Sequence, residues 1–137
     1  MIKSLSRRAL ILLPCLLGAC TTVPFSGRSQ LLLMSQPEER KLGQEAYQDI
    51  LKKAKLSTDR EKVELIRKVG HRLSKVADRP DFQWEFNLLE DDKMINAFCL
   101  PGGKVAFYTG ILPVADGEDG IAVVMSHEIA HALARHG

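Results

Sequence analysis

The chain has 137 residues, of which 45% are apolar and 26% charged, a balance typical of one globular domain and not of a disordered or multi-domain chain. Three of its 19 basic side chains lie among the first nineteen residues, which leaves 16 basic against 17 acidic side chains in the remainder. Nucleic-acid binding through a strongly basic surface is therefore excluded. The three cysteines, Cys15, Cys20 and Cys99, have neither the spacing of a disulfide framework nor that of a CxxC metal site.

The first twenty residues have the pattern of a lipoprotein signal. Basic residues within 1–8 precede an apolar run over 9–19, which is shorter than the about 20 residues that span a bilayer. The run ends in Leu17-Gly18-Ala19-Cys20, which resembles a bacterial lipobox. We therefore expect residues 1–19 to be a signal peptide and Cys20 to carry the lipid that anchors the mature chain. A plain signal peptide with an incidental cysteine is the alternative.

The residues that follow predict where the anchored chain resides. Thr21 stands where an inner-membrane retention signal would carry Asp, so we expect attachment to the outer membrane of the cell envelope, on its periplasmic face. Ser6-Arg7-Arg8 partly matches a twin-arginine signal, so export by this route or by the general secretory route stays open. The stretch Thr21–Ser29 is rich in Thr, Pro, Ser and Gly. Residues 20–34 are therefore assigned to a lipidated N-terminus and linker.

Two helices are predicted next. Ser35-Gln36-Pro37-Glu38 has the form of a capping box with proline in the first turn, so a helix begins near Pro37 and runs to about Ala54. Its expected apolar positions are Leu42, Ala46 and Ile50. Thr58-Asp59-Arg60-Glu61 repeats the capping pattern before a second helix, which Pro80 closes. The apolar face of the second helix is predicted to comprise Val63, Ile66, Val69, Leu73 and Val76.

A change of apolar period marks the strands. Trp84, Phe86 and Leu88 alternate with polar neighbours, which indicates a strand, and two more strands are predicted over 95–100 and 104–109, around a glycine-containing loop. Asp116-Gly117-Glu118-Asp119 has turn chemistry and can cap a final helix from about Glu118. The expected fold class is α+β, with residues 35–137 in one folded body.

The predicted final helix carries the pattern H-E-x-x-H. His127 and His131 lie one turn apart and point within about 40° of each other, so their imidazoles can hold one zinc ion. Glu128 is close enough to take a proton from a zinc-bound water. The alternative is a core helix with two incidental histidines. Because the helix is apolar on almost every side, we expect it to be buried, where such polar groups are costly unless they bind a metal.

A catalytic zinc needs a third protein ligand, and the chain has no persuasive one. His136 is expected to point to the opposite side of the helix from His127. It is therefore expected either to interact with the C-terminal end of the helix or to contact a zinc ligand without binding zinc itself. The spacing also fails the form H-E-x-x-H-x-x-G-x-x-H. His71, on the second predicted helix, is expected to be a surface or boundary histidine.

Three segments together resemble one family. Asn96–Lys104, Tyr108–Gly110 and His127–His136 look like the HtpX-like zinc metallopeptidases (family 48), which include the CAAX prenyl protease and the mitochondrial Oma-type protease. Val23–Arg28, followed by residues 31–34, resembles the N-terminal pattern of the bacterial, lipid-anchored Oma-like members. Cys99 stands where alanine is usual in this family.

The resemblance implies a zincin-like fold, of which residues 35–137 are the N-terminal part. It implies that His127 and His131 bind one Zn²⁺ per chain, that Glu128 is the catalytic base, and that the third ligand is a glutamate on a later helix beyond Gly137. The implied activity is that of a metalloendopeptidase, in which Glu128 activates a zinc-bound water. Its implied substrates are unfolded or misassembled envelope proteins, removed in proteolytic quality control.

The resemblance also implies that Asn96, Ala97 and Phe98 bind an extended substrate through backbone hydrogen bonds, although a purely structural hairpin is the alternative. Because the third ligand has no counterpart in the chain, two other hypotheses stay open. One is a non-catalytic periplasmic lipoprotein that acts as a chaperone or interaction module. The other is a truncated reading of a longer active enzyme.

Overall fold

The computed structural model describes residues 20–22, 29–31 and 34–135, which belong to two units, residues 1–33 and 34–137. In the first unit, strands β1 (Cys20–Thr22) and β2 (Ser29–Leu31) pair antiparallel, within the predicted linker. The predicted signal peptide and His136 lie outside the described residues. None of the helices in the described part of the chain combines the length and the apolar character that a bilayer span requires.

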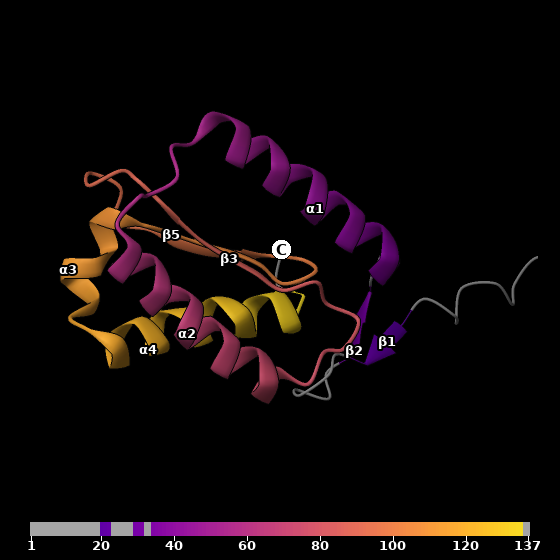
Figure 1. Ribbon diagram of the computed structural model, residues 1–137. Coiled ribbons are helices and arrows are strands. Elements are labelled where there is room, and N and C mark those ends of the chain that lie inside the picture. The colour runs from indigo at the N-terminus through magenta and orange to yellow at the C-terminus, as the bar shows by residue number, and fades with distance from the viewer. Residues whose placement is uncertain (1–19, 23–28, 32–33, 136–137) are drawn as a thin grey trace, which may run out of the picture. The chain divides into compact units, whose positions relative to one another are not determined.

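Two capped helices open the second unit (Figure 1). Helix α1 (Gln36–Lys53) begins with the predicted capping box, in which Ser35 and Glu38 exchange hydrogen bonds between side chain and backbone. Helix α2 (Arg60–Ala77) has Asp59 as its N-cap, one residue after the start of the predicted pattern. It ends at Asp78, whose φ of 46° is left-handed. Local capping chemistry thus determines both helix starts.

A three-stranded mixed sheet follows, in the order β3-β5-β4. Strand β3 (Glu85–Leu89) runs parallel to β5 (Lys104–Tyr108), and β4 (Ala97–Leu100) pairs antiparallel with β5 and forms an edge. A 3-10 turn η1 (Thr109–Ile111) and a short helix α3 (Leu112–Ala115) then lead to α4 (Glu118–Leu133). The α+β fold class is confirmed, although η1 and α3 were not predicted.

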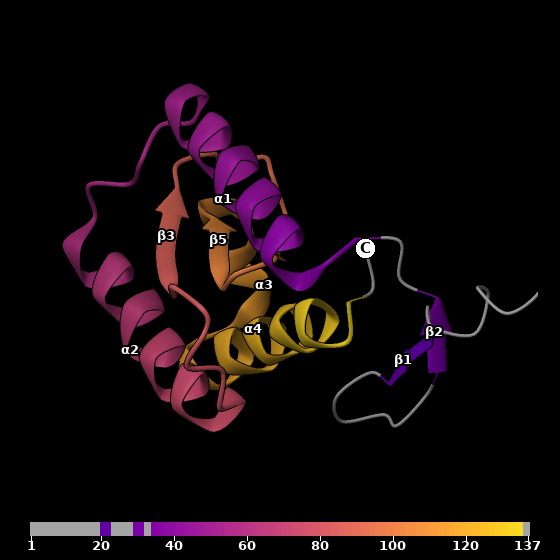
Figure 2. The same cartoon turned by 90° about the vertical axis from the view of Figure 1, so that its right-hand side faces the viewer.

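The sheet has helices on both faces (Figure 2). Helices α2 and α4 cover one face, where a large apolar cluster is buried between them and the strands. Helix α1 covers the other face with a small cluster whose buried members are Tyr47, Leu89 and Ala106. Alternation along β5 explains the division, because Val105 and Phe107 belong to the first cluster and Ala106 to the second.

The predicted apolar faces of α1 and α2 are partly wrong. In α1, Leu42 is 50% exposed and Ala46 is also exposed, whereas Gly43 and Tyr47 are buried. The reason is close packing, since a Cβ at Gly43 would lie 2.3 Å from the Pro101 carbonyl oxygen. In α2, Val76 is 79% exposed, and the next residue, Ala77, is buried instead. A search for regularly spaced apolar residues does not detect a glycine that is buried by close backbone contact, or a tyrosine that is buried with its hydroxyl hydrogen-bonded.

Candidate active site

Helix α4 is fixed to the rest of the unit along one side. Its buried residues recur every four positions and pack against α2 and the sheet; they are Ile121, Met125, Ile129 and Leu133. The first turn is tied to α2, because the Glu118 carboxylate accepts hydrogen bonds from Lys68 at 2.7 Å and Arg72 at 2.9 Å. Gly120 allows a close approach to α3, since a Cβ there would overlap the Ala115 carbonyl oxygen.

The opposite side of α4 is exposed, which corrects the prediction of a helix buried on almost every side. Val123 is 69% exposed, and Ser126, His127, Ala130 and His131 are exposed with it. These positions follow helical spacing, so they form one stripe. An apolar sequence does not identify which side of a helix has a partner. The two histidines are therefore not buried polar groups that need a metal to offset the cost of desolvation. Their assignment as metal ligands has to rest on the geometry of the two side chains.

The two imidazoles converge. His127 Nε2 and His131 Nε2 lie 2.9 Å apart, with ring centroids 4.4 Å apart and the rings nearly perpendicular. Two nitrogens bound to one tetrahedral zinc at 2.0–2.1 Å are about 3.3 Å apart, so this pair fits a zinc ion after a small ring rotation. Within residues 34–135, the structure gathers no cluster of three or more His, Cys, Asp or Glu that could hold a metal. His71 is exposed on α2, with its ring edge against Phe86, as predicted for a surface histidine.

Glu128 follows His127 on α4, whose buried side packs against the sheet. It is half-buried, and its negative charge acts on Cys99 of β4. Burial, and secondly the Glu128 charge, raise the pKa of the Cys99 thiol to about 12. The Cys99 thiol therefore keeps its proton to a higher pH than an exposed thiol would. Glu128 thus belongs to the same helix as the exposed histidine pair but is less exposed than either histidine.

The edge strand has a defined hydrogen-bonding phase. The Tyr108 backbone N–H donates to the Asn96 carbonyl oxygen at 3.1 Å, in register with the pairing of Ala97 with Phe107. Because backbone groups of an antiparallel strand alternate in direction, those of Asn96 and Phe98 point toward β5. Those of Ala97 and Cys99 point away from it, toward the side on which no described strand pairs.

Of the predicted substrate residues, the structure therefore leaves only Ala97 with an outward backbone. Asn96 is exposed, but Phe98 packs toward α1, with its ring 6.4 Å from that of Tyr47. Sequence reasoning missed the outward backbone of Cys99, since a pattern of apolar residues does not reveal hydrogen-bonding phase. Cys20 belongs to β1 by its backbone, and its predicted lipid stays a prediction.

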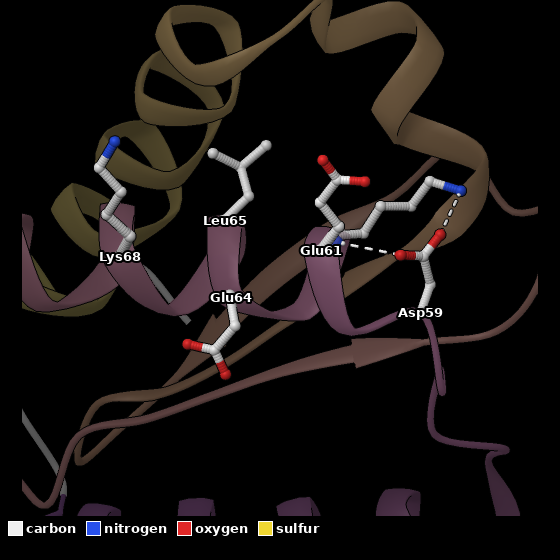
Figure 3. A pocket seen from close by; sticks show the side chains of 6 residues that line it. Asp59, Glu61, Glu64, Leu65 and Lys68 are labelled. Carbon is white, nitrogen blue, oxygen red and sulfur yellow. Dashed lines mark hydrogen bonds and ion pairs between the residues drawn. The ribbon is translucent and has the colours of Figure 1, made fainter.

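A shallow hollow of about 550 Å³ lies elsewhere, at the start of α2, and contains none of the predicted site residues (Figure 3). Most of its charged groups form ion pairs, such as Lys62 with Asp59 at 2.9 Å and Lys68 with Glu118 at 2.7 Å. These pairs account for its polarity as an ordinary charged surface, so the histidine pair is the stronger candidate site.

Comparison with known proteins gives a family. The model of "Peptidase family M48" matches residues 60–137, which include β3 to α4 and the histidine pair. The chain is 37% identical over 117 residues to the mitochondrial metalloendopeptidase OMA1 of Schizosaccharomyces pombe, covering 83% of this chain and 34% of that protein. It is 30% identical over 123 residues to the beta-barrel assembly-enhancing protease of Escherichia coli strain K12, covering 90% and 25% respectively. The chain thus spans about a third or less of the length of these curated relatives. It belongs to peptidase family M48.

Proposed function

We propose that the chain is part of a zinc-dependent metalloendopeptidase, with His127 and His131 as zinc ligands and Glu128 as the general base. The observation that carries the proposal is the 2.9 Å convergence of the two imidazole nitrogens, on a helix that also carries the half-buried Glu128. Membership of a peptidase family supports the reaction class. A non-catalytic lipoprotein is not favoured, because neither observation is needed by a chaperone or interaction module.

In peptide hydrolysis, the histidines and Glu128 have different roles: the histidines would bind the zinc ion, and Glu128 would transfer the proton. A bound zinc ion supplies Lewis acidity, which lowers the pKa of water to about 7 and polarises a carbonyl group. Glu128 accepts the proton of the attacking water and passes it to the nitrogen of the leaving amine. Its half-buried position on α4, directly after the ligand His127 in the sequence, fits this role.

Strand β4 positions the substrate. Ala97 is buried and Cys99 is half-buried, so an extended peptide would pair with the outward N–H and C=O groups of Cys99. Such pairing needs a segment without secondary structure of its own. We therefore propose unfolded or misassembled proteins of the cell envelope as substrates. The name of the Escherichia coli relative, which refers to β-barrel assembly, supports an envelope role.

The lipid anchor at Cys20 remains part of the proposal and has its own test. Replacing Cys20 with Ser removes the thiol that would carry the lipid, so labelling with a fatty-acid analogue should be lost and the protein should leave the membrane fraction. Unchanged labelling would contradict the anchor without affecting the catalytic proposal.

The catalytic proposal is tested by Glu128→Gln in a complete protein, one that contains this chain together with the third zinc ligand. The amide has almost the same shape but cannot accept a proton, so zinc binding should persist while casein hydrolysis falls on the order of 10²–10⁴-fold. The matched control is Glu118→Gln, which makes the same chemical change in the first turn of α4 and should leave hydrolysis almost unchanged. Near-normal hydrolysis by the Glu128 variant would refute the assigned base.

A further inference from the structure

The end of α4 is attached to the beginning of α1 by one arginine. Arg135 Nε donates to both carboxylate oxygens of Glu39, at 3.2 and 2.9 Å, and Nη2 donates to Glu39 and, at 2.8 Å, to the Met34 carbonyl oxygen. The Arg135 side chain is 10% exposed and that of Glu39 23%. A two-pronged guanidinium–carboxylate contact of this kind fixes orientation as well as distance.

The backbone of Arg135 provides a second, independent observation. Its φ of 55° is left-handed, a conformation that glycine usually supplies just after a helix. The chain has arginine there, and an unfavourable backbone conformation persists where the surrounding contacts hold it. The four contacts of the guanidinium group explain why a long side chain is present at a position suited to glycine.

The location of this contact connects it with the proposed metal site. His131 lies in the last turn of α4, where helices fray, whereas His127 has a helical turn on both sides. At the end of α4, the Ala134 N–H donates to the Ala130 carbonyl oxygen at 2.9 Å and the Arg135 N–H to the Ala132 carbonyl oxygen at 3.3 Å. Arg135 follows directly, so its attachment to α1 restrains the turn that carries His131.

We propose that Arg135, through Glu39 and the Met34 carbonyl, is a positioning residue that holds His131 in the orientation that converges on His127. This inference rests on the proposed zinc site. Arg135 acts through the helix end and not by touching the metal or the substrate. The pair joins residues 96 positions apart, so the metal-binding helix depends on the segment through which the chain enters α1.

The test compares the two ends of α4. Glu39→Gln removes the carboxylate at the His131 end, and Glu118→Gln removes the carboxylate that ties the first turn to Lys68 and Arg72. Zinc affinity of the full chain is measured by titrating Zn²⁺ alone in competition with a zinc-binding dye, and thermal melting is recorded without metal. Glu39→Gln should weaken zinc binding about tenfold, the lower end of the effect of residues that orient metal ligands. Glu118→Gln should change it less than twofold.

Two variants of Arg135 separate the effect of its side-chain contacts on zinc binding from the effect of its left-handed backbone conformation. Arg135→Gly accepts the left-handed conformation but loses the contacts, so it should weaken zinc binding as Glu39→Gln does; Arg135→Lys should retain part of the affinity. Equal losses for Glu39→Gln and Glu118→Gln, or unchanged affinity in Glu39→Gln, would overturn the positioning role while leaving the zinc site intact. Absence of zinc binding, both by the unaltered chain and by a longer protein that supplies the third ligand, would overturn the zinc site and, with it, this inference.

Discussion

The two faces of the sheet are covered by different means. On one face, α2 and α4 bury a continuous apolar cluster, with Met125 and Val105 fully inaccessible to solvent. On the other, α1 contributes Tyr47, whose hydroxyl donates to the Val105 carbonyl oxygen at 2.7 Å and accepts from Asn87 at 3.0 Å. The buried Lys104 ammonium, also near this face, donates to the Gln83 carbonyl oxygen and to Glu85.

The interactions on the two faces of the sheet affect α4 in different ways. The helix that carries the histidines is held by apolar burial, which is large in free energy and does not depend on the geometry of single bonds. Helix α1 buries a smaller apolar cluster and is held in addition by a few directional contacts, among them the Arg135–Glu39 pair. Burial therefore sets the depth and side of α4, while polar contacts with α1 set the orientation of its last turn.

The largest effect is expected from the apolar face. Met125 is fully buried beneath the turn that carries His127. Met125→Ala should lower the free energy of unfolding by about 2–5 kcal/mol, because it removes buried surface and leaves a cavity. Urea unfolding measures the change. A loss below about 1 kcal/mol would show that α4 does not depend on this cluster, and the contrast between the faces would fail.

A smaller effect is expected on the α1 face. Tyr47→Phe keeps the ring but removes the hydroxyl, which leaves the Val105 carbonyl oxygen and the Asn87 amide without this partner. The free energy of unfolding should fall by about 1–3 kcal/mol. The same urea experiment measures it, with Tyr108→Phe as the control on a half-buried tyrosine. A loss equal to that of Met125→Ala would contradict this difference between the two faces.

These contrasts also explain what the sequence could and could not predict. The helix start at Ser35 was predictable, and that of α2 was predictable to within one residue, since capping uses residues three apart in the chain. The histidine pair was predictable for the same reason, because its convergence needs only helical spacing. The exposed side of α4, and the burial of Gly43 in place of Leu42, depend on what packs against each helix, which no local pattern contains.

Long-range polar contacts were the least predictable part. Arg135 and Glu39 are far apart in the sequence, and neither is marked by its neighbours as a member of a pair. The outward backbone of Cys99 depends on the pairing phase of β4, which one hydrogen bond from Tyr108 reveals. Such features follow from tertiary structure alone, although they shape the proposed site.

The smallest expected effect is on how the free energy of unfolding depends on pH, to which one residue from each face contributes. Each holds one weak acid whose charged form is disfavoured in the folded state. Burial raises the pKa of Cys99 from 9.0 to about 12 on the α4 face, with help from the Glu128 charge. On the α1 face, burial also raises the pKa of Tyr47 from 10.0 to about 12. Both groups stay protonated in the folded chain at a pH where the unfolded chain has lost the proton.

The sign of the effect follows from proton binding. Above pH 9, the unfolded chain binds fewer protons at Cys99 than the folded chain, so stability falls as pH rises. Tyr47 adds a second decrease above pH 10. In urea unfolding at pH 8, 9.5 and 10.5, Cys99→Ala should remove most of the early decrease, which is less than about 1 kcal/mol at pH 9.5. Tyr47→Phe should retain this early decrease and reduce the later one. If Cys99→Ala follows the unaltered chain from pH 8 to 9.5, the Cys99 thiol is not held neutral, and the packing of β4 against α4 must be looser than the buried contacts indicate.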